Sequence, residues 1–229
     1  MGLSVSASSI DIVCKGILFD MDGILISSLG SVERSWTKWA LMRGIDPEYA
    51  LRNIHGRRSI ETVAKLRPDL DAETENQIIE QIEIEDTEGI TVLPGVQSLL
   101  QSLPPDRWTV VTSATEPLAR VRLAIVGVPL PERIVTADSV AQGKPHPAPY
   151  LAGAQLLGLA PEECVVFEDA ASGTRAGRAA GCLVIATTFS HSIEELSAAH
   201  YLISDLTAVT EAAAPDCDAI TLRFAPLAI

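Results

Sequence analysis

A short apolar run ends in two carboxylates at residues 12–23, which read IVCKGILFDMDG. The branched and aromatic residues of 12–19 predict a buried strand, and Asp20 and Asp22 follow directly after it. Side chains two positions apart on an extended chain point the same way, so we expect the two carboxylates to lie together. They would repel each other unless a cation or a shared proton compensates, although an Asp-Gly pair is also typical of a simple turn.

Further apolar runs alternate with helical stretches along the rest of the chain. The runs are 108–112, 133–136, 164–167, 182–187 and 201–203, and the helical stretches between them include 94–103, 117–126, 147–157 and 173–180. This alternation predicts the α/β class, with a doubly wound, Rossmann-like and mostly parallel sheet. In such sheets ligands bind outside the carboxyl ends of the strands. The C-terminal residues 218–229 are expected to add a last edge strand or a tail.

Residues 24–89 interrupt the alternation, because they show no convincing strand. Apolar residues at helical spacing instead mark three segments, 32–42, 59–66 and 73–84. Such spacing is typical of helices that bury one face. We therefore predict an all-helical insertion at 24–89, within an α/β core formed by 12–23 and 90–229.

An acidic stretch lies within this insertion. Residues 69–88 hold nine acids and no Lys or Arg. The acids are spread around the predicted helix and are not focused on one turn. We therefore interpret the stretch as a solvated helix face with its connecting loops, and not as a cation site.

The composition argues against several classes of partner. The chain of 229 residues carries 17 Lys and Arg against 30 Asp and Glu, a formal net charge of -13. Nucleic acids and anionic membranes are bound largely by basic side chains, so neither is an expected partner. No stretch approaches the ~18 apolar residues of a membrane span, and the N-terminus lacks the pattern of a signal peptide. The four cysteines are too widely spaced for a metal or redox pair, and reduced, buried thiols are typical of the cytoplasmic protein that we expect.

A second carboxylate pair follows another apolar run. Glu168 and Asp169 come directly after 164–167, as Asp20 and Asp22 do after the first run. Carboxylates that converge from adjacent strand ends form a hard oxygen-ligand set, which suits Mg²⁺. A solvated cluster of acids without an ion is the alternative, but it explains poorly why each pair follows an apolar run.

Two further segments carry a hydroxyl and a lysine. Ser113 and Ala114 follow the run 108–112 just before a predicted helix, where hydroxyl and free N–H groups suit an anion such as phosphate. Helix capping explains Ser113 equally well. Lys144 lies in the segment 143–147, GKPHP, whose prolines restrict where the lysine can reach. A lone loop lysine is usually solvated, but a lysine placed among carboxylates would offset their charge and hold a phosphate oxygen.

The chain order of these features resembles the four motifs of the haloacid dehalogenase superfamily of phosphohydrolases. The resemblance extends over 13–203, and the insertion at 24–89 is similar to the superfamily's C1-type helical cap domain. A closer resemblance is to the sugar- and polyol-phosphate phosphatases, the glycerol-phosphatase and 2-deoxyglucose-6-phosphatase group. It rests on residues that mostly lie outside the motifs, at 23–27, 55–58, 64–69, 142–147, 149–151 and 186–189. Ile24 and Ser27 depart from the Thr and the acid usual among these relatives.

The resemblance implies a Mg²⁺-dependent phosphatase that acts on a small phosphorylated metabolite as a monomer. Asp20 would be the nucleophile that forms an aspartyl-phosphate, and Asp22 the general acid that protonates the leaving oxygen. The ion would be held by the Asp20 carboxylate, the Asp22 backbone carbonyl and Asp169. Ser113, the Ala114 N–H and Lys144 would take phosphate oxygens.

The resemblance also implies supporting roles. Glu168 would orient Lys144 or an outer-shell water. In the cap, the segment 55–58 would face the active site and read the leaving group, with His55 and Arg58 as the candidate contacts. A surface charge is the alternative for Arg58. The cap would close about hinges near Gly23 and Gly89.

Two other functions remain open from the sequence. A β-phosphoglucomutase-like sugar phosphomutase would share the core, the metal and the acid–base aspartate. Such mutases resemble one another in a histidine shortly after the first motif, and residues 27–42 contain none. A catalytically inactive phosphate-binding protein is the other alternative, although every catalytic position holds a competent residue.

Overall fold

The computed structural model describes residues 9–54, 58–212 and 218–228. Within them, a five-stranded sheet has the order β5-β2-β6-β7-β8. Its strands are β2 Gly16–Phe19, β5 Trp108–Val110, β6 Cys164–Glu168, β7 Leu183–Thr187 and β8 Tyr201–Ile203. All neighbouring pairs are parallel, so the predicted α/β class with a parallel sheet is confirmed. β2 lies at the centre of the site-forming strands, between β5 and β6.

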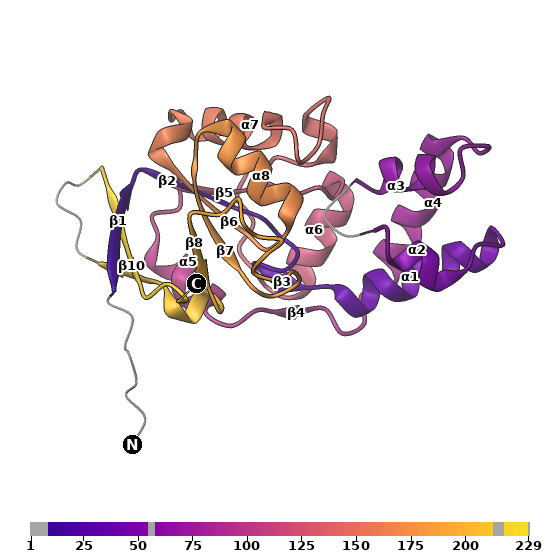
Figure 1. Cartoon of the computed structure of the whole chain (residues 1–229), viewed down its shortest axis with the longest axis horizontal. Coiled ribbons are helices and arrows are strands. Elements are labelled where there is room, and N and C mark those ends of the chain that lie inside the picture. Colours follow the sequence, from indigo (N-terminus) through magenta and orange to yellow (C-terminus); the bar gives the residue numbers. More distant parts are fainter. Residues whose placement is uncertain (1–8, 55–57, 213–217, 229) are drawn as a thin grey trace, which may run out of the picture.

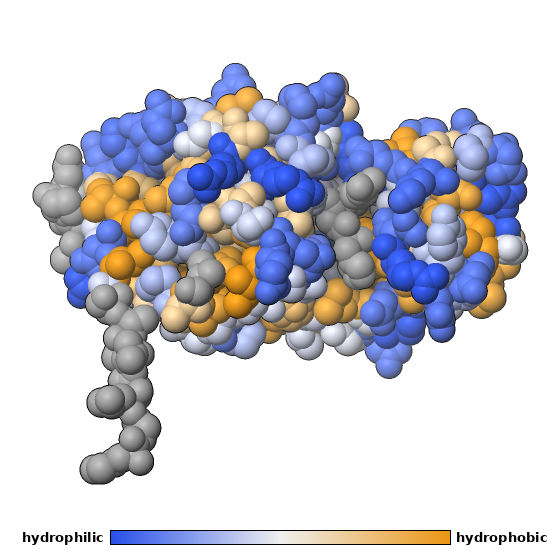
Figure 2. Space-filling view, viewed as in Figure 1, coloured by the Kyte–Doolittle hydropathy of each residue, from blue (hydrophilic) through white to orange (hydrophobic). Residues whose placement is uncertain are grey.

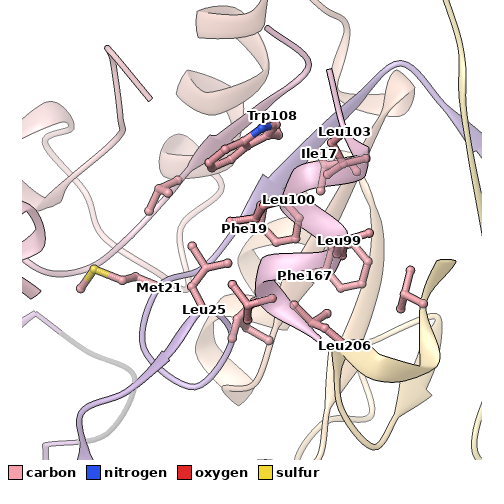
Figure 3. Close-up of a cluster of buried hydrophobic side chains, with 14 of the residues drawn as sticks. Ile17, Phe19, Met21, Leu25, Leu99, Leu100, Leu103, Trp108, Phe167 and Leu206 are labelled. Atoms are coloured by element: carbon pink, nitrogen blue, oxygen red, sulfur yellow. The ribbon is translucent and has the colours of Figure 1, made fainter. Parts of the chain in front are cut away.

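Helices cover both faces of this sheet, as its strands' alternating side chains require. One face carries Phe19 and Phe167, which pack with helix α5 Val96–Ser102 and helix α6 Glu116–Ile125. Figure 3 shows Leu99 and Leu100 of α5, and Leu103 directly after it, lying against this face. The other face carries Leu18, Val166 and Val184, which pack with helix α7 Ala148–Leu157 and helix α8 Ala171–Ala180.

The first predicted strand is in fact two strands. β1 Ile10–Cys14 pairs antiparallel with β10 Ile220–Phe224, and β10 pairs with β9 Thr210–Ala212. β10 is therefore the middle strand of a small separate sheet and not the edge strand that we predicted. β1 exposes alternate side chains, including Asp11, which pairs with Arg223 at 2.7 Å. β2, in contrast, is buried along its whole length. One half of the apolar run therefore suits a sheet with an exposed face, and the other half suits the buried parallel sheet.

The predicted strand at 133–136 is also wrong. Only Val135 bridges to Val111, through its N–H to the Val110 carbonyl at 2.9 Å and its carbonyl to the Thr112 N–H at 2.9 Å. The run is too short to continue this pairing, so it ends in a single bridge next to the site.

The insertion is built from four helices in the described part of the chain. They are α1 Leu29–Met42, α2 Pro47–Leu51, α3 Ser59–Leu66 and α4 Ala72–Glu85. Their buried side chains, including Trp36, Trp39 and Ile79, form a hydrophobic cluster of their own. Helix α2 was not predicted, although Asp46 caps it and Pro47 opens it, because it spans little more than one turn. Figure 1 shows these helices at one end of the molecule, beyond the carboxyl ends of the parallel strands.

A short strand pair joins the insertion to the core. β3 Ile26–Ser27 pairs antiparallel with β4 Thr91–Val92. β3 lies inside the segment that we predicted to contain helices only, and two residues were too few to reveal it. The chain therefore enters and leaves the helical insertion side by side (Figure 1).

The acidic stretch is only partly a solvated face. Figure 2 shows many hydrophilic side chains over the helical insertion. Glu75 and Glu83 of α4 are nevertheless buried, because they share a helix face with Ile79 and Ile82. Glu75 accepts hydrogen bonds from the Trp39 indole at 2.8 Å and from Arg43 Nε at 2.7 Å. The solvated interpretation was therefore wrong for these two acids.

None of the helices over the described ranges is long and apolar enough to cross a membrane.

Gly95 offers a test of the packing between α5 and the segment after β8. Its φ of +83° is left-handed, and a Cβ there would lie 2.3 Å from the Leu206 carbonyl carbon. Gly127 has a similar φ of +66°, but a Cβ there would meet no described atom within 4 Å. Both Gly→Ala changes should cost the backbone strain of about 1 to 2 kcal/mol. Gly95→Ala should lower the free energy of unfolding by about 1 to 3 kcal/mol more, since the core must shift.

Urea unfolding followed by circular dichroism measures both variants. If both variants lose the same free energy of unfolding, the chain at Leu206 moves aside without cost. That result would contradict the larger loss expected for Gly95→Ala.

Candidate active site

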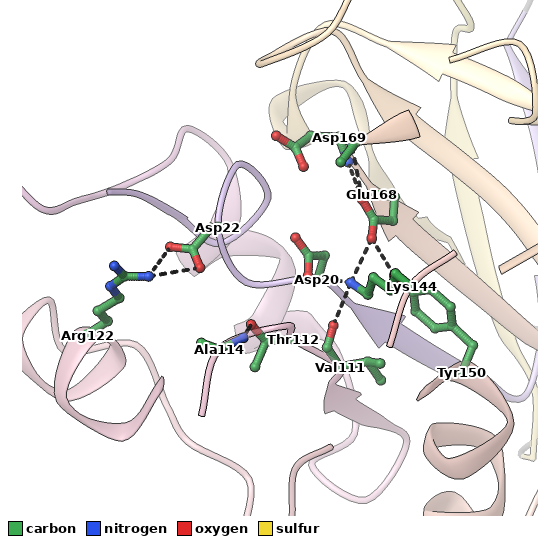
Figure 4. A network of polar contacts seen from close by, with 11 residues as sticks. Asp20, Asp22, Val111, Thr112, Ala114, Arg122, Lys144, Tyr150, Glu168 and Asp169 are labelled. Atoms are coloured by element: carbon green, nitrogen blue, oxygen red, sulfur yellow. Dashed lines mark hydrogen bonds and ion pairs between the residues drawn. The ribbon is translucent and has the colours of Figure 1, made fainter. Parts of the chain in front are cut away.

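The predicted polar residues meet in one cavity of about 140 Å³, outside the carboxyl ends of β5, β2 and β6. It is lined by Asp20, Asp22, Ser113, Ala114, Lys144, Glu168 and Asp169 among others. Helices α1 and α4 of the insertion close its far side, through Trp36 and Glu83. The cavity thus lies between the parallel sheet and the helical insertion. Figure 4 shows most of its polar residues together.

Lys144 is the buried cation at the centre of this cluster. Its ammonium group donates to Asp20 Oδ1 at 2.6 Å, to Glu168 Oε1 at 2.7 Å and to the Val111 carbonyl at 3.0 Å. Burial would lower the pKa of Lys144, but the charges of Asp20 and Glu168 outweigh that effect and leave the pKa above its usual value. The lysine is therefore charged and links the ends of three neighbouring strands.

Glu168 is fully engaged by its neighbours. Oε1 accepts from Lys144 and from the Tyr150 hydroxyl at 2.7 Å, and Oε2 accepts from the backbone N–H groups of Asp169 at 2.9 Å and Ala170 at 3.0 Å. Gly173 makes room for it, since a Cβ there would lie 1.6 Å from Oε1. These contacts fit a residue that positions Lys144.

Tyr150 contacts Glu168, although the sequence did not indicate it as a site residue. Its ring lies in the face of α7 that packs on the sheet, with the Lys144 ammonium 5.0 Å from the ring centroid. Burial raises the pKa of the Tyr150 hydroxyl, so the group stays protonated and can donate to Glu168. A tyrosine at a buried position of a helix is also an ordinary core residue, so its spacing gave no separate signal.

Three acids could share a cation. Asp20, Glu168 and Asp169 each offer a carboxylate oxygen, and these oxygens lie within 4.8 Å of one another. Burial raises the pKa of Asp20 to about 7 against the opposing charge of Lys144, and burial together with Glu168 raises that of Asp169. Because both carboxylate oxygens of Glu168 already accept hydrogen bonds, Asp20 and Asp169 are the side chains best placed to hold an ion. An all-oxygen set fits Mg²⁺, whose charge would offset the buried negative charge.

The Asp22 carboxylate points away from this set. Figure 4 shows it directed toward Arg122, whereas the Asp20 carboxylate lies beside Lys144. β2 ends at Phe19, and the chain turns so that the Leu25 N–H bonds back to the Met21 carbonyl at 2.9 Å. The expectation that both carboxylates point the same way was therefore wrong, because the chain is no longer extended there.

Asp22 is held by side chains from two segments. The Ser28 hydroxyl donates to Oδ1, and Arg122 Nη1 lies 3.2 Å from each carboxylate oxygen. Arg122 comes from α6 and is only 3% exposed. Its Nη2 lies 3.5 Å from Glu83 Oε1. An acid of the insertion, an arginine of the core and Asp22 therefore form one chain of charges.

Sequence reasoning missed both Arg122 and Glu83. Each stands on the apolar face of its helix, Arg122 beside Leu118 and Leu123, and Glu83 beside Ile79. A charge on a buried helix face needs a partner, and this signal could have identified both residues. Burial raises the pKa of Glu83 to about 7, while Arg122 opposes the rise.

The predicted anion-binding segment follows β5. Ser113 lines the cavity, and the Ala114 N–H donates to the Thr112 hydroxyl at 3.1 Å. Helix α6 begins two residues later, at Glu116. Both residues are thus at the predicted strand end, and their role toward a phosphate stays a prediction.

The structure describes only part of the segment predicted to contact the leaving group. His55 and Arg57 lie outside the described residues. The Arg58 guanidinium donates to the carbonyls of Val140 at 2.7 Å and Ala141 at 3.4 Å, and Arg58 lines a second, neighbouring cavity. In this structure it joins the insertion to the core loop before Lys144. Its predicted contact with the leaving group stays untested.

Known proteins resemble the chain over most of its length. Residues 14–181 match the family of haloacid dehalogenase-like hydrolases. Hexitol phosphatase A of Escherichia coli (strain K12) is 45% identical over 212 residues, which cover 90% of this chain and 98% of that protein. Glycerol-1-phosphate phosphohydrolase 2 of Saccharomyces cerevisiae is 36% identical, over 82% of this chain and 80% of that protein. The crystal structure of a hydrolase from Pseudomonas syringae superposes with a TM-score of 0.75 at 25% identity, over 85% and 94% of the two chains.

Gly23 and Gly89 offer a matched test of the cation set. Both have left-handed backbones, with φ of +84° and +76°. A Cβ at Gly23 would lie 1.8 Å from Asp169 Oδ2, whereas one at Gly89 would meet no atom within 4 Å in the described part of the chain. Gly23→Ala should displace the carboxylate and weaken Mg²⁺ binding by about 10- to 100-fold. Gly89→Ala should leave the affinity unchanged.

Titration calorimetry with MgCl₂ measures both affinities, and thermal unfolding shows whether the variants are folded. If folded Gly23→Ala binds Mg²⁺ as tightly as the parent chain, Asp169 is not a ligand.

Proposed function

Because the chain belongs to the haloacid dehalogenase-like hydrolases, we propose that it hydrolyses a small sugar- or polyol-phosphate monoester through an aspartyl-phosphate, with Mg²⁺ as its cofactor. The family and the phosphatase group expected from the motifs are confirmed by these relatives, so the chain is a phosphoric monoester hydrolase. The observation that carries the finer proposal is the buried contact between Lys144 and Asp20 at the floor of a cavity capped by helices.

Asp20 is the proposed nucleophile. Lys144 holds Oδ1 of its carboxylate, which fixes the orientation of the group toward the cavity. Attack of the carboxylate on phosphorus forms the acyl-phosphate bond and breaks the bond to the leaving oxygen. Water then attacks the same phosphorus, which releases inorganic phosphate and restores the carboxylate.

Asp22 is the proposed general acid and base. An alkoxide is a poor leaving group, so the departing oxygen needs a proton, and a positioned acid contributes about 10² to 10⁴ in rate. Ser28 and Arg122 hold the Asp22 carboxylate on the side of the cavity that faces the insertion. From there it can protonate the leaving oxygen and later accept a proton from the attacking water.

The remaining residues would hold the phosphate and the ion. Mg²⁺, bound by Asp20, Asp169 and the Asp22 backbone carbonyl, would supply the positive charge that lets two anions approach. Lys144, Ser113 and the Ala114 N–H would take phosphate oxygens, and Glu168 would keep Lys144 in place. We further propose that 24–89 is a cap over a core of 12–23 and 90–229. A monomeric, cytoplasmic state stays a prediction.

Phosphate release tests this function. With Mg²⁺, the protein should release phosphate from an aryl phosphate and from a hexitol phosphate, and Asp20→Asn should lower the rate at least about 10³-fold because the nucleophile is lost. A chelator of Mg²⁺ should abolish the activity, and added Mg²⁺ should restore it. A colorimetric phosphate assay measures all of these rates.

Two outcomes would contradict the proposal. No release from aryl, hexitol or glycerol phosphate with Mg²⁺ would favour a phosphate-binding protein without catalysis. Conversion of glucose 1-phosphate into glucose 6-phosphate, in place of free phosphate, would favour a sugar phosphomutase.

A further inference from the structure

The end of the cavity that faces the insertion is mostly apolar. Val32, Trp36 and Ile54 line it, and Glu83 is the one ionisable side chain that the described residues of α1–α4 contribute. Glu83 is 4% exposed and lies in this wall together with Trp36. A buried carboxylate is costly, so its position in this wall needs a reason beyond solubility.

Arg122 contacts Glu83 from the core, but some N–H groups of its guanidinium lack a hydrogen-bond partner. Its Nη1 is committed to Asp22, and its Nη2 lies 3.5 Å from Glu83 Oε1. Nη2 and Nε form no hydrogen bond with any residue that the structure describes, although the side chain is only 3% exposed. Glu83 and Arg122 both line the cavity, and the unpaired Nε and Nη2 of Arg122 are buried behind that lining.

Among the described residues that line the cavity, acidic side chains outnumber basic ones. In the described part of the chain, Asp22 and Glu83 share Arg122, and Asp20 and Glu168 share Lys144; His191 lines the cavity as well. A phosphate at Lys144 would extend its leaving group toward Asp22 and Glu83. A carboxylate or second phosphate on that group would meet buried negative charge, and like charges in a desolvated site repel strongly.

We propose that Glu83, held by Arg122, makes this enzyme select an uncharged, hydroxyl-bearing leaving group and reject one that carries a second anionic group. The proposal rests on the proposed phosphatase function. Glu83 accepts hydrogen bonds from substrate hydroxyls, Arg122 keeps Glu83 in place, and Trp36 and Val32 contact the carbon skeleton. Polar groups that a substrate must satisfy discriminate strongly against analogues that cannot do so.

Two esters of nearly equal size test this selection. Glycerol phosphate and phosphoglycerate, both esterified at a primary hydroxyl, differ in a terminal hydroxymethyl group against a carboxylate. The parent enzyme should favour glycerol phosphate in kcat/KM by about 10²-fold or more. Glu83→Gln keeps the side-chain length and an acceptor oxygen but removes the charge, so it should reduce this ratio at least about tenfold. Because burial raises the pKa of Glu83 to about 7, the assays are run well above pH 7, where the ionised form predominates.

Glu85→Gln is the matched control. It removes the same charge from the same helix at an exposed position outside the cavity, so its ratio should equal that of the parent enzyme. Because both esters are measured on one preparation, the ratio does not depend on the fraction of folded protein. A merely structural role of Glu83 would lower both rates and leave the ratio unchanged.

The outcomes separate the two proposals. If the parent enzyme cleaves an aryl phosphate but shows no preference for glycerol phosphate, the assignment of Glu83 is overturned while the phosphatase function stands; this measurement needs no variant. An unchanged ratio in folded Glu83→Gln also overturns it. If no ester is cleaved, both proposals fail.

Discussion

The ammonium group of Lys144 is the interaction on which the rest of the site depends. Asp20, Glu168 and Asp169 are buried side by side, and three ionised carboxylates cannot share a desolvated space without positive charge. Lys144 supplies one such charge by contacting Val111 and Asp20, which follow β5 and β2, and Glu168, the last residue of β6. A single cation thus ties together the ends of three neighbouring strands. The room for this arrangement comes from Gly173, and its orientation is completed by the Tyr150 hydroxyl.

A second set of charged contacts in the site connects the core with the helical insertion. Asp22 turns away from Asp20 because the chain leaves the extended conformation after Phe19, and Arg122 then binds it from helix α6. Glu83 reaches the same arginine from the insertion. Asp22 and the wall that the insertion contributes are therefore linked through the guanidinium of Arg122.

The sequence predicted the class of fold and the residues at the strand ends because both depend on local patterns. A strand followed by Asp20 or by Glu168 is visible within ten residues of chain, and parallel strands must bring such ends to one edge. Arg122 and Glu83 depend instead on contacts between distant helices: their places on apolar helix faces indicate that each needs a partner, but not which partner. The division of the first run into β1 and β2, and the reduction of 133–136 to one bridge, were likewise set by tertiary pairing with β10 and Val111.

The pairing of β3 with β4 bears on how such enzymes diversify. Ile26 lies opposite Val92, so the helical segment leaves and rejoins the core at two adjacent points of one ladder. Neighbouring strands are about 4.8 Å apart whatever is attached to them. A segment of different length or composition can therefore be exchanged at this ladder without displacing Asp20 or Lys144. The ladder sets where the insertion joins the core, and the contact of Glu83 with Arg122 couples the insertion to the cavity.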